Sequence, residues 1–136
     1  MMKITGIEHI GIAVEDLKKS GKFWDHILKS KNKTTEIVKE QDVITEIYDT
    51  GRGKIELLFS KNKDSTISKF IKTKGPGIHH VCLKVDNIID AINELKEEGV
   101  RLIGDSYSIG AEGYKIIFIH PKSTGGVLVE LAEDRI

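Results

Sequence analysis

Two histidines occupy matched places in the two halves of this chain, on stretches whose pattern is typical of β-strands. Residues 6–14 and 77–85 superimpose with a shift of 71 residues, and this shift sets His9 on His80. A lone histidine on a strand is usually a surface residue or a hydrogen-bonded core residue. The duplication favours a shared role instead, and imidazole nitrogen is a common metal ligand.

Two glutamates show the same duplication. Residues 54–58 and 128–132 superimpose with a shift of 74 residues, which sets Glu56 on Glu130. Strand alternation directs each carboxylate away from the face of its aliphatic neighbours. A solvated sheet face with a tolerated glutamate is the simpler alternative, but a buried, unpaired carboxylate would cost several kcal/mol. Because four such residues lie at symmetric places, we favour an arrangement in which they bind one cation together and so offset the cost of burying the carboxylates.

The chemistry that this set suggests is metal binding with open coordination positions. Two imidazoles and two carboxylates suit an octahedral divalent ion such as cobalt, manganese, nickel or zinc. Cys82 is the only cysteine, so the chain offers neither an internal disulfide nor a cysteine-based zinc site. Candidate ligands are His9, Glu56, His80 and Glu130.

Apolar periodicity predicts the elements that position these residues. In residues 4–14, Ile10, Ile12 and Val14 share one face of a strand, and His9 shares the other with the small residues Gly11 and Ala13. Asp16 is the expected N-cap of a helix over residues 17–29, and the lysine-rich residues 29–33 are expected to form a solvated turn. Further strands are expected at residues 35–38, 43–48 and 54–59.

The second half repeats this order. A strand over residues 78–85 leads, through Asp86 or Asn87 as N-cap, into an amphipathic helix that Gly99 ends. Further strands are expected at residues 101–103, 114–120 and 127–131. Residues 61–77 read as a connector with a short helix at residues 65–72.

The pattern predicts an α+β fold made of two paired βαβββ modules. We expect a single domain over residues 1–136, because this length fits one domain or two half-domains sharing a core. A repeat of half the chain is too long for a solenoid and fits a fused pair of modules. Module one covers about residues 4–60, the connector residues 61–77, and module two residues 78–132.

Composition excludes several partners. Lys and Arg together number 21, as do Asp and Glu, so no net charge attracts nucleic acid or an anionic membrane. There is no apolar run near 18 residues and no signal-peptide pattern after Met1. We therefore expect a cytoplasmic protein that binds neither nucleic acid nor a membrane.

Several motifs resemble the vicinal oxygen chelate superfamily, which includes glyoxalases, bleomycin resistance proteins and ring-cleaving dioxygenases. The His and Glu pattern is shared across that superfamily. Other motifs are more specific and resemble the methylmalonyl-CoA epimerase family. These motifs are Gly77–Val81, Asp64–Ile67 followed by Phe70, Ile109–Ala111, and the ending His120–Leu131.

The resemblance implies that the two modules form a cupped, barrel-like mixed sheet around a divalent metal ion. It implies metal ligands at His9, Glu56, His80 and Glu130, with cobalt preferred over manganese, nickel or zinc. Some family members carry glutamine at the position of Glu56. The resemblance also implies an acyl-CoA substrate and a homodimer.

The activity implied is the interconversion of the (R) and (S) epimers of methylmalonyl-CoA through a metal-stabilised enolate. Returning the C2 proton to the opposite face requires two bases. By resemblance Glu130 is one base as well as a ligand. The second family base is a glutamate on the third strand, for which Glu46 is the nearest candidate, and Thr45 competes for the position.

Two other functions fit the same pattern. A glyoxalase-type lactoylglutathione lyase would use similar ligands, and a metal-free small-molecule-binding module would share the fold without catalysis. Strand alternation assigns His79 to packing. Lys122, Ser123 and Thr124 are interpreted as turn residues, with binding of the substrate carboxylate or CoA phosphates as the alternative.

Overall fold

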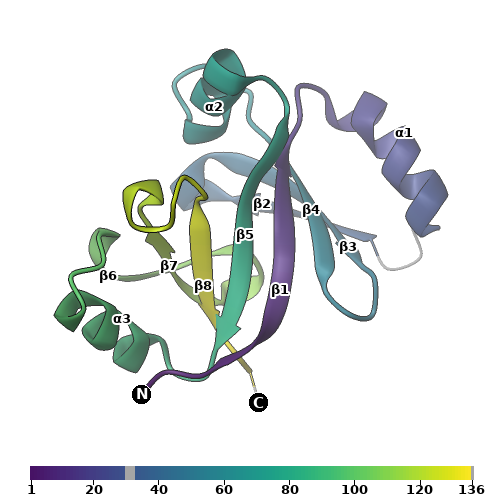
Figure 1. The fold of residues 1–136 in the computed structure, drawn as a ribbon. Helices are drawn as coiled ribbons and strands as arrows, with labels where there is room; N and C mark the ends of the chain where they lie inside the picture. Colours follow the sequence, from purple (N-terminus) through teal and green to yellow (C-terminus); the bar gives the residue numbers. More distant parts are fainter. Residues whose placement is uncertain (30–32, 136) are drawn as a thin grey trace. The chain divides into compact units, whose positions relative to one another are not determined.

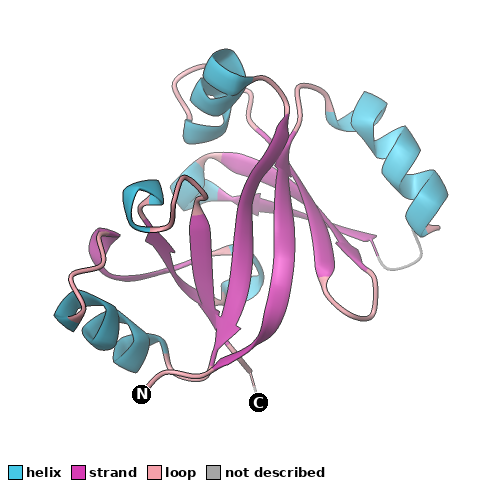
Figure 2. Ribbon diagram, in the orientation of Figure 1, coloured by secondary structure: helices cyan, strands magenta, loops and turns pink. Residues whose placement is uncertain are grey.

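The computed structural model describes residues 1–29 and 33–135, and its elements follow the order predicted (Figures 1 and 2). The first βαβββ series is β1 (Ile4–Ala13), α1 (Leu17–Leu28), β2 (Lys33–Val38), β3 (Val43–Asp49) and β4 (Lys54–Phe59). Helix α2 (Thr66–Lys74) connects it to the second series. This comprises β5 (Gly77–Val85), α3 (Ile88–Glu97), β6 (Leu102–Ile109), β7 (Lys115–Ile119) and β8 (Val129–Glu133). The predicted α+β class is confirmed.

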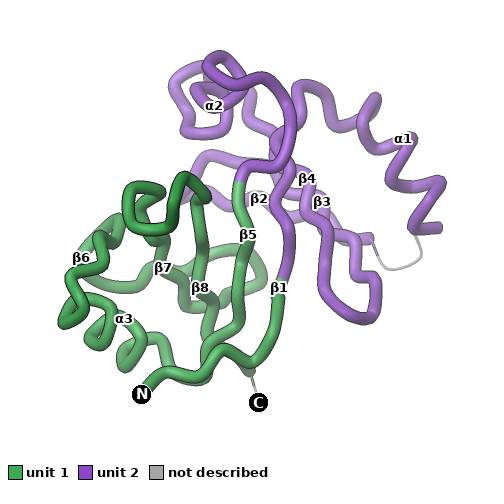
Figure 3. The backbone as a smooth tube through the Cα atoms, viewed as in Figure 1, with its two compact units in different colours: residues 1–8, 80–136 green, residues 9–79 purple. Residues whose placement is uncertain are grey.

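The chain divides into two compact units (Figure 3). The first unit comprises residues 1–8 and 80–136, and the second comprises residues 9–79. Strands β1 and β5 each begin in one unit and end in the other. None of the helices in the described part of the chain is both long and apolar enough to span a membrane.

In the second unit a mixed sheet has the strand order β2-β3-β4-β1. Strand β1 runs parallel to β4, and β3 is antiparallel to both of its neighbours. The two faces of this sheet pack on different helices. One face packs on α1, through Val14, Tyr48, Leu57, Leu17 and Trp24. The other face packs on α2, through Ala13, Val43, Leu58, Ile67 and Phe70.

In the first unit the corresponding mixed sheet has the strand order β5-β8-β7-β6, with β5 parallel to β8. Helix α3 covers one face, and its core comprises Val85, Ile88, Ala91, Ile92, Leu95, Ile117, Ile119 and Leu131. The opposite face carries a second buried cluster of Cys82, Ile116 and Ala132.

The duplication seen in the sequence is present in the backbone. Gly6 and Gly77 have φ angles of +154° and +155°, in a region that side-chain-bearing residues rarely adopt. Asp16 and Asn87 cap α1 and α3 with almost the same backbone angles, φ −151° and −148°. Each cap side chain accepts a hydrogen bond from the backbone amide three residues later. Asn87, not Asp86, is therefore the cap of α3.

Strand β6 differs most from the prediction. It runs over Leu102–Ile109, whereas the sequence pattern predicted residues 101–103. Its pairing with β7 shifts between Ile103 and Ser108, and nearly all of its residues are exposed at the edge of the sheet. An exposed, bulged edge strand does not need alternating apolar residues. The sequence of β6 therefore resembles that of a turn, and the pattern predicts only its beginning.

Two adjacent isoleucines at the start of α3 test the packing of this helix. Ile88 is fully buried in the core of the first unit, whereas Ile89 is 53% exposed. Ile88→Ala should lower the free energy of unfolding by about 2–5 kcal/mol, because it leaves a cavity. Ile89→Ala should change it by less than about 0.5 kcal/mol. Chemical denaturation of both variants measures the difference, and equal effects would contradict this packing.

Candidate metal centre

In the second unit, His9 and Glu56 meet on neighbouring parallel strands. His9 lies on β1 and Glu56 on β4, where Glu56 stands opposite Gly11. The His9 Nδ1 and Glu56 Oε2 atoms are 3.0 Å apart, and the residues are only 6% and 3% exposed. Gly11 has no side chain to compete for this space. The buried Glu56 carboxylate thus lies against an imidazole. A buried charge needs such a partner to offset its lost solvation.

In the first unit, His80 and Glu130 form the equivalent pair. His80 lies on β5 and Glu130 on β8, opposite Cys82. The His80 Nε2 and Glu130 Oε1 atoms are 3.1 Å apart, and the residues are 5% and 6% exposed. The Phe118 ring meets the imidazole edge to face, with 5.7 Å between the ring centroids. This apolar contact on one side restricts the orientation of the His80 ring.

Each pair fits the chemistry of half of a divalent metal site. An imidazole nitrogen and a carboxylate oxygen are ligands that zinc, cobalt, manganese and nickel all accept. Both pairs join the first and last strands of a βαβββ series, on the face away from α1 in one unit and α3 in the other. The placement that strand alternation predicts for the four side chains is therefore observed within each unit.

His79 has a different environment from its neighbour His80. Its ring packs edge to face against Phe70 of α2, with 4.9 Å between the ring centroids. This contact agrees with the packing role that the sequence pattern assigned to it.

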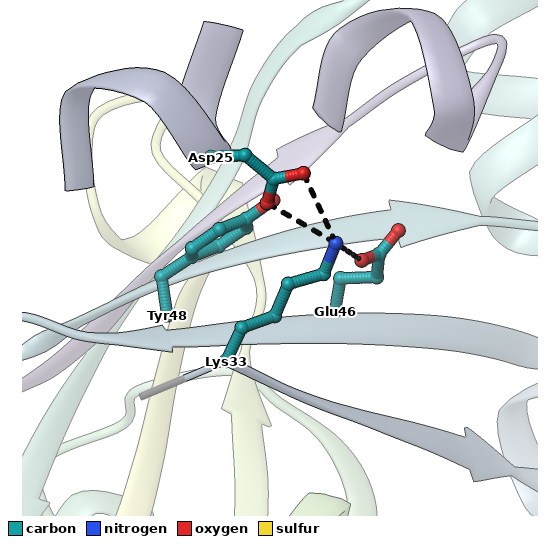
Figure 4. A network of polar contacts seen from close by, with 4 residues as sticks. All are labelled: Asp25, Lys33, Glu46 and Tyr48. Carbon is teal, nitrogen blue, oxygen red and sulfur yellow. Dashed lines mark hydrogen bonds and ion pairs between the residues drawn. The ribbon is translucent and has the colours of Figure 1, made fainter. Parts of the chain in front are cut away.

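Glu46 takes part in a network of polar contacts between β2, β3 and α1 (Figure 4). The Lys33 ammonium donates to Glu46 Oε2 at 2.7 Å and to Asp25 Oδ1 at 3.1 Å. The Tyr48 hydroxyl donates to the same Asp25 oxygen at 2.8 Å. This hydrogen bond is the main reason why the pKa of Asp25 is lowered. Contact with the Glu46 carboxylate raises the pKa of Lys33.

The pairing of β3 with β4 places Glu46 on the sheet face away from Glu56. Ile47 of β3 stands opposite Glu56 of β4, so alternation puts Glu46 on the other face of this sheet. That face packs on α1, and the Glu46 carboxylate is bound there by Lys33. Thr45, which competed for the position, shares the face of Glu56 and is buried. A base acting beside Glu56 would have to lie on that face, and Glu46 does not.

The sequence pattern does not predict this network. It predicts a lysine-rich turn over residues 29–33, of which residues 30–32 lie outside the described part of the chain. Lys33 instead begins β2 and pairs with Tyr48 of β3. The register between the two strands would have been needed to find this contact, because Lys33 and Glu46 are far apart in the sequence.

The turn before β8 has the structure expected of a turn. Ser123 Oγ accepts a hydrogen bond from the Arg101 amide, and Thr124 Oγ1 accepts one from the Val127 amide. His120 accepts from the Lys122 amide through Nδ1. Partial burial and the nearby cations Arg101 and Lys122 lower the pKa of His120. The interpretation of Ser123 and Thr124 as turn residues is consistent with these contacts.

The fold and the two pairs agree with what the chain resembles among known proteins. Residues 8–118 match the family model of the glyoxalase/bleomycin resistance protein/dioxygenase superfamily. The chain belongs to this superfamily.

Individual relatives are more specific. Over 128 residues the chain is 40% identical to the human mitochondrial methylmalonyl-CoA epimerase, covering 93% of this chain and 73% of that protein. The crystal structure of methylmalonyl-CoA epimerase from Mycobacterium tuberculosis matches with a TM-score of 0.91 at 32% identity, covering 98% of this chain and 90% of that one. A methylmalonyl-CoA epimerase in complex with methylmalonyl-CoA and NH4+ matches with a TM-score of 0.89 at 30% identity, covering 97% and 96%.

These similarities confirm the predicted resemblance to the methylmalonyl-CoA epimerases. They also confirm the prediction of an enzyme of the isomerase class that is similar to these epimerases.

Tyr48 provides a test of the network around Lys33. Burial, followed by its hydrogen bond to Asp25, raises the pKa of Tyr48 to about 12. A raised pKa stabilises the folded state below the unfolded value near 10, and this contribution is lost as the pH rises through about 12. Tyr48→Phe should lower the free energy of unfolding by about 1 kcal/mol at neutral pH. It should also remove the ionisation near pH 12 from an ultraviolet absorbance titration of the tyrosines.

Tyr107→Phe is the matched control, because Tyr107 is on the exposed strand β6. This variant should keep the ionisation near pH 12. An unchanged titration in the Tyr48→Phe protein would contradict the buried hydrogen bond.

Proposed function

We propose that this chain is a metal-dependent epimerase that interconverts the (R) and (S) epimers of methylmalonyl-CoA. The observation that carries the proposal is the pair of buried imidazole–carboxylate contacts at equivalent places in the two βαβββ series. The similarity to methylmalonyl-CoA epimerases over nearly the whole chain supports the choice of substrate.

In this proposal His9, Glu56, His80 and Glu130 hold one divalent ion, with cobalt first and manganese, nickel or zinc as alternatives. The donor set supports this, because two nitrogens and two oxygens leave positions open for substrate oxygens. When bound, the ion supplies positive charge that stabilises the substrate enolate.

The protein's own part in the reaction is to move the C2 proton. We assign Glu130 as one base, because its carboxylate is buried beside His80 and so is fixed in position. Transfer to the opposite face requires a second group. Glu46 is poorly placed for this role, because its carboxylate lies on the face that packs on α1 and binds Lys33. Thr45 lies on the face of Glu56, where its hydroxyl is buried.

We further propose that the active form is a homodimer in the cytoplasm. The resemblance predicts the homodimer, and the composition predicts the location.

A glyoxalase-type lactoylglutathione lyase is the second candidate function, because the superfamily to which the chain belongs includes glyoxalases. Assaying methylmalonyl-CoA and a glutathione hemithioacetal side by side separates the two activities. A metal-free binding module of the same fold would turn over neither compound.

Exchange of the C2 proton tests the proposed reaction. One epimer of methylmalonyl-CoA incubated with metal-loaded protein in deuterated water should racemise and incorporate deuterium at C2. Glu130→Gln should slow this by at least about 100-fold, since a general base contributes 10²–10⁴ to the rate. Proton NMR measures both changes. Absence of exchange with the metal-loaded wild-type protein would refute the epimerase proposal.

The adjacent histidines test the metal site separately from the activity. His80→Ala removes the imidazole beside Glu130 and should weaken divalent-metal binding by more than tenfold in calorimetry. His79→Ala is the matched control, since His79 packs on Phe70, and it should bind metal as the wild type does. Similar affinities in the two variants would contradict a ligand role for His80.

A further inference from the structure

The segment that joins the two βαβββ series carries a concentration of positive charge. Residues 60–77 contain five lysines and one aspartate, although the whole chain has a formal net charge of zero. All five lysine side chains are exposed. Three of them, Lys69, Lys72 and Lys74, lie on α2. This charge is therefore a local feature of the α2 region.

Helix α2 lies on the sheet face that carries the His9–Glu56 pair. Ile67 and Phe70 of α2 pack with Ala13 of β1 and Leu58 of β4. Alternation along these strands puts Ala13 on the face of His9, and Leu58 on the face of Glu56. The exposed lysines of α2 are thus at one end of the face on which the candidate ligands lie.

Lys74 is directed back toward the packed side of the helix. Its ammonium lies 5.9 Å from the centroid of the Phe70 ring, in a cation–π contact. Phe70 in turn contacts His79 at the beginning of β5. Lys74 is therefore held beside Phe70, on the side of α2 that packs on the sheet.

We propose that Lys69, Lys72 and Lys74 bind the diphosphate and 3′-phosphate groups of the CoA substrate. This inference rests on the proposed function. A CoA thioester has its reacting carbonyl at one end and its phosphates at the other, separated by the flexible pantetheine arm. Because α2 packs on the face that carries the His9–Glu56 pair, a thioester whose acyl group lies at that pair can extend its pantetheine arm toward the α2 lysines. Lysine ammonium groups are mobile, multiply donating partners for phosphate oxygens.

The chain contains its own control for a non-specific effect of charge. Helix α1 carries Lys18, Lys19 and Lys22, which are also exposed. This helix packs on the opposite face of the same sheet, against Val14, Tyr48 and Leu57. Neutralising these three lysines changes the net charge by the same amount as neutralising the three lysines of α2. The change is made away from the face that carries His9 and Glu56.

The experiment compares two triple variants with two substrates. One variant carries Lys69→Gln, Lys72→Gln and Lys74→Gln, and the other carries Lys18→Gln, Lys19→Gln and Lys22→Gln. Glutamine keeps the helix propensity of lysine. The substrates are methylmalonyl-CoA and the methylmalonyl thioester of pantetheine, which lacks the nucleotide. KM and kcat are measured for each combination at low ionic strength, where charge effects are largest.

The α2 variant should raise KM for methylmalonyl-CoA by about tenfold and leave kcat unchanged, since exposed ion pairs each contribute a factor of about 1.4–5. Its KM for the pantetheine thioester, and both KM values of the α1 variant, should match the wild type. An unchanged KM for methylmalonyl-CoA would overturn the proposal. Equal increases for both substrates would also overturn it, because they would indicate a structural defect.

Direct binding separates this inference from the proposed reaction. If the wild-type protein turns over neither thioester, the epimerase proposal fails, and calorimetry with CoA alone then tests the lysines. CoA binding that is weakened only in the α2 variant would support the phosphate site. Failure of the wild type to bind CoA, or equal binding by both variants, would overturn it.

Discussion

The contact between a buried imidazole and a buried carboxylate, made twice, is the interaction on which the rest of the structure depends. In each unit it joins the first and last strands of a βαβββ series, which run parallel to each other. A carboxylate excluded from water needs a partner that offsets its lost solvation. The histidine supplies that partner, and the parallel pairing of the strands sets the distance between them.

Both imidazole–carboxylate pairs lie on the sheet face opposite the one that packs on α1 or α3. In the first unit the largest apolar cluster packs on α3, whereas His80 and Glu130 lie on the other face with Cys82. In the second unit α1 packs on one face, whereas His9 and Glu56 lie on the other face, which also packs on α2. Gly11 and Cys82, which are small, stand opposite the two glutamates and leave them room.

Strand alternation and the two sequence shifts were sufficient to predict which faces the four residues occupy. Gly6 and Gly77, and the caps Asp16 and Asn87, repeat in the backbone as they do in the sequence. The position of Glu46 could not be predicted in this way, because it depends on the register of β3 against β4 and on Lys33. Cross-strand register and contacts between distant residues leave no periodic signal in a single chain.

We propose that the two imidazole–carboxylate pairs, one from each βαβββ series, bind a single metal ion that is needed for epimerisation. Elemental analysis of protein purified without chelators, combined with an assay of methylmalonyl-CoA epimerisation before and after metal removal, tests this proposal. We expect one divalent ion per chain, loss of activity when it is removed, and recovery when cobalt is added. Two ions per chain, or full activity in metal-free protein, would refute it.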